Sequence, residues 1–241
     1  MKETGVILYD GPSVLDGSPI VVIATLKSKN SKTGDVVQTW ILRSDVNPLE
    51  ASEKKQDYSI CGGCPHRQSI GGGCYVNIGQ APNGVFKAYK RGMYAKVDDN
   101  RLAELMKKRK VRIGAYGDPA AVPYRVWERV TGFASGWLGY THQQGHPKFD
   151  KRILDFCMLS VDTPKQAQKA NARYFRVKTP ESPMMENEIE CLADSKGMTC
   201  LECGKCNGMA GEGPSIVINV HGTRSARYTN KFKGVNIAVA A

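Results

Sequence analysis

The sequence has no apolar run of about 20 residues, the length that a helix needs to cross a bilayer. It also lacks a charged start followed by the apolar stretch of a signal peptide. We therefore expect no membrane partner and a cytoplasmic location. Disulfide staples are not expected either, because 241 residues can bury a core of their own and cytoplasmic thiols stay reduced.

Acidic residues are in the minority: 23 Asp and Glu stand against 34 Lys and Arg, which gives a net charge of +11. A basic surface attracts polyanions, because neutralised phosphates release their counterions. A nucleotide or nucleic acid is an expected partner, with a merely solvated basic surface as the alternative. The most basic stretches are 107–110, expected in the last turn of a helix, and the tail with Arg224, Arg227, Lys231 and Lys233.

Apolar patterning predicts the fold. Two β-branched runs, 18–28 and 35–45, flank a turn-forming segment and predict an antiparallel hairpin. After residue 96, apolar runs alternate with helical segments, an order typical of βαβ units with a parallel sheet. The expected fold class is α/β: a partial (β/α) barrel of about six mainly parallel strands, with an N-terminal β-hairpin and a cysteine-rich insertion.

We expect the chain to form a single domain over 1–241. Its expected parts are the hairpin and first strand (1–45), a first cysteine loop (46–95), βα repeats (96–180), a second cysteine cluster (181–214), and a last strand with the basic tail (215–241). Helices are expected at 97–110, capped by Asp98 or Asp99; at 122–132, with Pro123 in its first turn and Gly132 at its end; at 147–156; and at 163–172, capped by Thr163.

Four polar residues directly follow expected parallel strands: Asp118, His142, Asp162 and His221. Ligands bind at the carboxyl ends of such strands, so these residues are expected to ring one mouth. His142 and His221, together with Tyr116, are the candidates for lining a pocket. Structural alternatives remain open, since Asp162 precedes a helix that it can cap and either histidine can be a satisfied structural residue.

Seven of the eight cysteines fall in two clusters, and both spacings are typical of metal sites. The second cluster has a C-x2-C-x2-C core that matches the first three ligands of a bacterial ferredoxin, and a further cysteine upstream can be the fourth ligand. Four thiolates also suit a structural zinc ion, so both metals stay open. The ligands expected here are Cys191, Cys200, Cys203 and Cys206.

The first cluster, Cys61, Cys64 and Cys74, has the spacing C-x2-C-x9-C. Three cysteines suit either a zinc ion whose fourth ligand is His66, or a [4Fe–4S] cluster with one iron left open. The remaining cysteine, Cys157, lies within an apolar segment and is expected in the core.

The surroundings of the first cluster resemble a known family. A strand ("VQTWILR"), a three-cysteine loop ending in "CYVN", a helix and a strand ending in Gly-Asp-Pro ("RIGAYGDPAAVP") are similar to the start of a radical S-adenosylmethionine barrel. More closely, about residues 20–225 resemble phage-encoded proteins of unknown function that share the patterns "CGxCPHR", "CYVNxGQAP", "GxYGDPAAVP" and "CxxCGxC". This resemblance implies the cytoplasm of a host cell as the location.

The resemblance implies that the first three cysteines bind a site-differentiated [4Fe–4S] cluster. It also implies that Gly117 and Asp118 hold the methionyl amine of S-adenosylmethionine, with Tyr75 as a further cofactor-binding residue. The chain departs from the family's C-x3-C-x2-C spacing, in which an aromatic residue precedes the last cysteine, and it has Asp118 where the family has Glu. The second cluster would then resemble the auxiliary clusters of some radical enzymes.

The expected function is that of a radical-SAM-like iron–sulfur protein that acts on a nucleotide or nucleic acid, with a reductant as a further partner. The first alternative is a non-enzymatic, zinc-stabilised protein that binds nucleic acid or a host factor, in which His66 completes the first site. The second alternative keeps the barrel and the clusters but has no cofactor chemistry.

Overall fold

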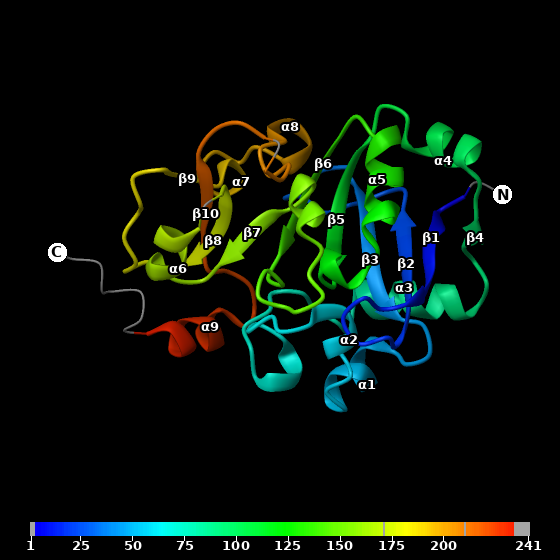
Figure 1. Cartoon of the computed structure of the whole chain (residues 1–241), viewed down its shortest axis with the longest axis horizontal. Coiled ribbons are helices and arrows are strands. Elements are labelled where there is room, and N and C mark those ends of the chain that lie inside the picture. Colours follow the sequence, from blue (N-terminus) through cyan, green and yellow to red (C-terminus); the bar gives the residue numbers. More distant parts are fainter. Residues whose placement is uncertain (1–2, 171, 210, 234–241) are drawn as a thin grey trace.

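The computed structural model describes residues 3–170, 172–209 and 211–233. In these residues the centre is one mixed sheet of ten strands, in the order β4-β1-β2-β3-β5-β6-β7-β8-β10-β9 (Figure 1). The α/β class is confirmed. The strands are β1 (Gly5–Pro12), β2 (Pro19–Thr25), β3 (Val37–Arg43), β4 (Ala95–Lys96), β5 (Lys110–Tyr116), β6 (Gly136–Thr141), β7 (Met158–Val161), β8 (Tyr174–Lys178), β9 (Glu188–Glu190) and β10 (Ser215–Asn219).

The strands β1, β2 and β3 pair antiparallel, while the two-residue strand β4 pairs parallel with β1 at the edge. β2 and β3 pair as the expected hairpin, with Ile20 opposite Arg43 and Thr25 opposite Gln38. The strand β1, which the apolar pattern did not predict, pairs antiparallel with β2 and has an irregular register between Ile7 and Tyr9.

From β3 onward the sheet is parallel. The neighbours β3, β5, β6, β7, β8 and β10 all run in the same direction. Their carboxyl ends therefore meet at one edge of the sheet. The helices α1, α2 and α9, at Pro48–Glu53, Tyr58–Cys61 and Ser225–Phe232, lie with the first cysteine loop at that edge, below the sheet in Figure 1.

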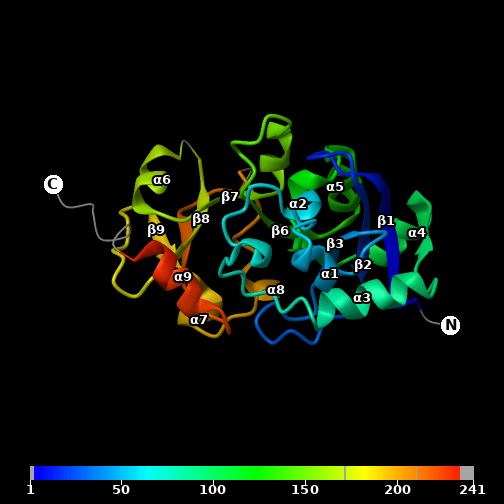
Figure 2. The same ribbon diagram turned by 90° about the horizontal axis from the view of Figure 1, so that it is seen from below.

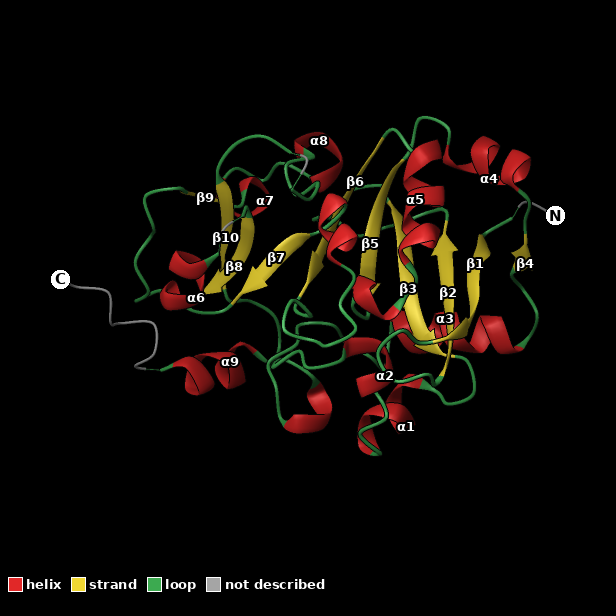
Figure 3. Ribbon diagram, in the orientation of Figure 1, coloured by secondary structure: helices red, strands yellow, loops and turns green. Residues whose placement is uncertain are grey.

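Most helices are short. They connect successive strands along the chain and lie around the sheet (Figure 3). They are α1 (Pro48–Glu53), α2 (Tyr58–Cys61), α3 (Ala81–Lys90), α4 (Asp99–Met106), α5 (Tyr124–Phe133), α6 (Pro164–Lys169), α7 (Leu192–Ser195), α8 (Cys200–Cys203) and α9 (Ser225–Phe232). Three 3-10 turns span Gln68–Ile70, Pro119–Ala121 and Lys151–Asp155. Within the described residues, none of these helices combines the length and apolar character that a membrane span requires.

Two of the expected helix starts are confirmed. The Asp98 carboxylate caps α4 by accepting from the Arg101 amide at 2.8 Å. The Thr163 side chain caps α6 in a capping box with Gln166, and Pro164 occupies the first turn.

Three other boundaries were wrong. The helix α4 ends at Met106, because Lys108 adopts a positive φ of 59° and Lys110 already opens β5. The cations of 107–110 therefore do not occupy a helical last turn. Segment 147–156 forms the 3-10 turn Lys151–Asp155 rather than an α-helix, and α5 runs one residue past Gly132.

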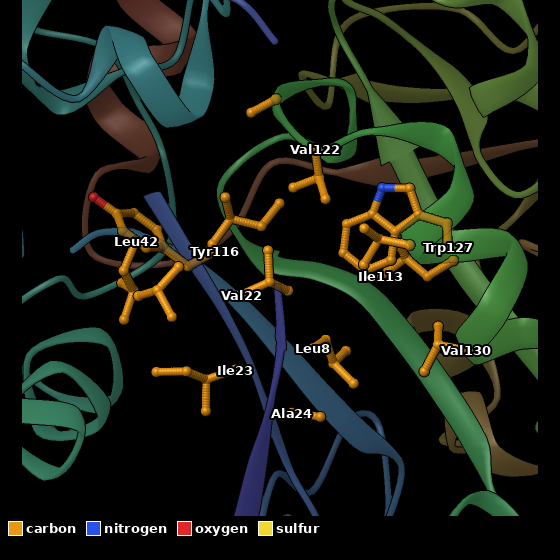
Figure 4. Close-up of a cluster of buried hydrophobic side chains, with 14 of the residues drawn as sticks. Leu8, Val22, Ile23, Ala24, Leu42, Ile113, Tyr116, Val122, Trp127 and Val130 are labelled. Carbon is orange, nitrogen blue, oxygen red and sulfur yellow. The ribbon is translucent and has the colours of Figure 1, made fainter. Parts of the chain in front are cut away.

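The main hydrophobic core packs both faces of the sheet against helices that include α3, α4 and α5, and Figure 4 shows part of it beside α5. Trp127 of α5 is fully buried there against residues such as Val22 and Ile113, and its indole nitrogen donates to the Pro119 carbonyl at 2.9 Å. Cys157 is buried in the same core, as expected, and burial raises the pKa of its thiol well above the usual range.

Candidate functional site

A cavity of about 190 Å³ opens at the carboxyl ends of the parallel strands. The four strand-end residues, Asp118, His142, Asp162 and His221, all line it. The three cysteines of the first loop form part of the same wall. The cavity therefore combines thiols, imidazoles and carboxylates with apolar surface from β7, β8 and the residues after β10.

The first cysteine cluster begins at Cys61, the last residue of α2, and the backbone that follows folds back on itself. The Cys64 amide donates to the Cys61 carbonyl at 3.1 Å, and the Cys74 amide donates to the His66 carbonyl at 2.9 Å. These two bonds bring Cys74 back beside the first two cysteines across nine intervening residues. The loop also contacts α9, since a Cβ on Gly73 would lie 2.8 Å from the Tyr228 side chain (Figure 2).

Asp118 is buried, and its carboxylate accepts four hydrogen bonds. One oxygen accepts from the Ala120 amide at 3.0 Å and the Thr141 hydroxyl at 2.8 Å. The other accepts from the His142 amide at 2.8 Å and the Gln143 side chain at 3.2 Å. An ionised carboxylate offers about four lone-pair positions, so Asp118 has its capacity filled by the protein itself.

Gln143 connects Asp118 to the cysteine loop and was missed by the sequence reasoning. Its amide nitrogen donates to the Cys61 carbonyl at 2.8 Å, and its carbonyl oxygen accepts from the Gly63 amide at 2.9 Å. The contact is so close that a Cβ on Gly62, which has a φ of +51°, would lie 2.1 Å from the Gln143 oxygen. Asp118 and Gln143 together hold the loop against the ends of β5 and β6.

The three thiols differ in their surroundings. Burial raises the pKa of Cys61 well above its usual range, and it raises the pKa of Cys74 to about 11. Cys64 lies against an imidazole, with 3.6 Å between its Sγ and His142 Nδ1. Thiols that titrate this high are protonated near neutral pH, so a metal ion that binds them must displace protons.

His66, His142 and Asp162 converge beside the cysteines. His66 Nε2 lies 2.6 Å from Asp162 Oδ1, and His142 Nε2 lies 3.4 Å from the same oxygen. Burial alone would lower the pKa of His142, but Cys64 and Asp162 hold it well above its usual range. Burial alone would raise the pKa of Asp162, whereas the hydrogen bonds from His142 and His66 hold it well below its usual range.

This arrangement corrects one expectation. Thr163 is the N-cap of α6, whereas the Asp162 carboxylate faces the two histidines and the cavity. His66 contacts Asp162 through Nε2 and stacks on Tyr228 with ring centroids 5.1 Å apart, while its buried Nδ1 has no hydrogen-bond partner in the structure.

The second cysteine cluster lines a separate, smaller pocket, where Cys191, Cys200, Cys203 and Cys206 lie with Tyr140. The helix α8, which carries two of them, is capped by Thr199 and attached to the loop between β2 and β3. Burial raises the pKa of Cys206 to about 12. Tyr140 lines both pockets, so its side chain lies between the two cysteine groups.

The spacing of the ligand atoms distinguishes the two kinds of site. Among the described residues, the group of three ligand atoms that lie within 4.8 Å of one another is His66, His142 and Asp162, and no three cysteine sulfurs meet that limit. All eight cysteines are free thiols. A single zinc ion draws its ligands around one point, whereas a cubane takes each thiolate on a different iron.

The remaining sequence candidates occupy different parts of the cavity. Tyr75 is half exposed at its mouth, and its ring lies 5.5 Å from that of His221. Tyr116 is almost fully buried and packs in the hydrophobic core, which raises its pKa well above the usual range. Gly117 has a φ of +84° and turns the chain at the end of β5.

Arg112 is a second residue of the cavity that the sequence reasoning missed. Arg112 lies in a strand whose buried and half-buried residues alternate, and a cation at a half-buried position of such a pattern does not indicate a binding site.

The chain matches no family model, and comparisons with curated proteins and with solved structures also give no match.

Proposed function

We propose that this chain is an iron–sulfur protein that resembles radical S-adenosylmethionine enzymes and acts on a nucleotide or nucleic-acid substrate. The observation that carries the proposal is the wall of the cavity. Three thiols from one loop, Cys61, Cys64 and Cys74, face an open space at the carboxyl ends of parallel strands. Three soft ligands next to a cavity suit a cluster with one iron left for an exogenous ligand.

The donor set fits such a cluster. The three sulfurs are not gathered around one point, as a zinc ion would require, and the loop is held from outside by Gln143 and by the backbone bond between Cys74 and His66. When bound, a [4Fe–4S] cluster of this kind supplies one electron to the sulfonium of S-adenosylmethionine. The chain's own tasks are to orient the cofactor and to exclude water, which the buried apolar wall favours.

The parallel series β3, β5, β6, β7, β8 and β10 supports the finer proposal of a partial (β/α) barrel of six strands. In that arrangement Gly117 lies at the end of the barrel where the cofactor would bind. Asp118 has no free acceptor for the cofactor's amine, so we assign it the role of positioning the loop through Gln143. The amine would then contact backbone carbonyls near the turn at Gly117, with Tyr75 at the entrance.

Cys191, Cys200, Cys203 and Cys206 are proposed to bind a second, auxiliary cluster. The zinc alternative at the first site would use His66 as its fourth ligand, since Nε2 contacts Asp162 and the buried Nδ1 has no hydrogen-bond partner in the structure. This alternative is supported less well because the three sulfurs are not gathered around one point.

Anaerobic reconstitution with iron and sulfide tests the proposal. We expect brown protein with absorption near ~400 nm, which is typical of thiolate-bound clusters, and release of 5′-deoxyadenosine from S-adenosylmethionine after reduction. Cys64→Ser should abolish that release, and Cys157→Ser is the control, because Cys157 lies in the core away from both pockets. Cys203→Ser should remove about half of the bound iron. Colourless protein that retains two zinc ions in air would refute the iron–sulfur proposal.

A further inference from the structure

Arg112 differs from other half-buried arginines of the described residues, such as Arg109 and Arg173, whose guanidinium groups donate to backbone carbonyls. Arg176 is fully buried and bonded to Glu188, with its two nitrogens 2.6 Å from the two carboxylate oxygens. Arg67 is bonded to Asp57 at 2.9 Å. Arg112 has no carboxylate within 4.0 Å in the part of the chain that the structure describes.

The contacts of Arg112 leave most of its donors free. One terminal nitrogen donates to the Tyr75 hydroxyl, and the guanidinium carbon lies 6.0 Å from the centre of the Tyr75 ring. Its Nε is buried and has no hydrogen-bond partner in the structure. A buried donor without a partner costs free energy, so a group that satisfies it is stabilising.

Among the residues that the structure describes, no carboxylate of the cavity is free to neutralise this cation. The two acidic side chains of the cavity are already committed, Asp118 to four donors and Asp162 to the two histidines. Part of the wall is apolar and includes Phe175 and Val177 of β8. A guanidinium in such a wall has the geometry for bidentate binding of a planar or tetrahedral anion.

We propose that Arg112 anchors an anionic group, a carboxylate or a phosphate, of a small molecule that occupies the cavity beside the three cysteines. The cavity of about 190 Å³ accommodates such a head group with a short apolar portion against β8. Without a ligand, the hydroxyl of Tyr75, which is half exposed at the mouth, accepts a hydrogen bond from the Arg112 guanidinium. The anionic group of the ligand replaces this hydroxyl as the acceptor. This inference rests on the proposed function in that it names the ligand class of the same cavity.

Modification of arginine by phenylglyoxal, mapped to single residues by mass spectrometry, tests the inference on the full-length protein. Three probes are used: inorganic phosphate, S-adenosylhomocysteine, which carries an amino-acid carboxylate, and adenosine, which carries no anion. Phosphate or S-adenosylhomocysteine should slow the modification of Arg112, and adenosine should not. Protection by phosphate alone assigns the anion to a substrate, and protection by S-adenosylhomocysteine assigns it to the cofactor.

Variants extend the test to affinity. Arg112→Gln should weaken binding of the protecting probe roughly 10- to 100-fold, the range for hydrogen bonds to charged groups, and Arg112→Lys should weaken it less. The exposed Arg125 on α5 provides the matched control, Arg125→Gln, which should bind as the parent does. Tyr75→Phe removes the hydroxyl that accepts from Arg112, so it should speed the modification of Arg112 in the absence of a probe.

The inference is overturned if neither anion protects Arg112, or if Arg112→Gln binds the probe as tightly as the parent protein. Each measurement is made before and after iron reconstitution. Absence of a cluster with intact protection of Arg112 refutes the proposed function alone, whereas a full cluster with unaltered binding by Arg112→Gln refutes the anion site alone.

Discussion

Gln143 is the residue whose replacement most directly tests how the cysteine loop is held. The change Gln143→Met keeps the length of the side chain and removes three hydrogen bonds, to the Cys61 carbonyl, the Gly63 amide and the Asp118 carboxylate. At a net value of about 1 kcal/mol for each bond, the expected loss of stability is about 3 kcal/mol. For a chain of this size, that loss lowers Tm by roughly 6–12 °C.

Thermal unfolding of the metal-free protein, followed by circular dichroism, measures this loss, and iron content after reconstitution measures the effect on the loop. The neighbouring change Gln144→Met is the matched control, because Gln144 makes a single bond of 3.3 Å to the Ser160 carbonyl. We expect it to cost less than about 1 kcal/mol. If Gln143→Met unfolded at the control's temperature and bound as much iron, the assigned role of the network of Asp118 and Gln143 would be wrong.

Two further predictions concern the framework around the site. Glu188→Gln leaves the buried Arg176 without its charge partner, so we expect a loss of about 3–5 kcal/mol in chemical denaturation; a loss below 1 kcal/mol would contradict the importance of this pair. Gly117→Ala should destabilise the protein more than Gly17→Ala, measured by the same method. Both glycines have a φ near +84°, at +84° and +83°, but a Cβ at Gly117 would lie 2.6 Å from the Ile41 side chain, whereas nothing lies within 4 Å at Gly17. Equal losses for the two variants would show that backbone strain alone sets the cost.

Local patterns predicted the elements whose stability is local. The β2–β3 hairpin followed from two β-branched runs around a turn, and the start of α6 followed from Thr163 and Pro164. The strand β1 was not predicted, because its irregular register and its polar end at Asp10 blur the alternation of apolar and polar residues. The end of α4 was predicted wrongly, because the cations of 107–110 are compatible with the last turn of a helix and do not show that Lys110 belongs to β5.

The candidate site divides in the same way. The rule that ligands bind at strand ends drew attention to Asp118, His142, Asp162 and His221, and these side chains do line one cavity. The roles of Gln143 and Arg112 depend on partners that are distant in sequence. Gln143 meets the cysteine loop about 80 residues away, and Arg112 meets Tyr75 across 37 residues. Such roles depend on tertiary contacts, so no local sequence motif predicts them.

The two cysteine pockets are physically coupled through shared neighbours. Tyr140 lines both. Burial raises the pKa of Cys206, and Tyr140 lowers it to a smaller extent. Arg112 lines the first pocket and also interacts electrostatically with Cys200 of the second. If Arg112 binds an anion as proposed, a change of charge at the second cysteine group would alter that affinity through this interaction. Because linkage is reciprocal, the bound anion would then change metal affinity at the second group by the same factor.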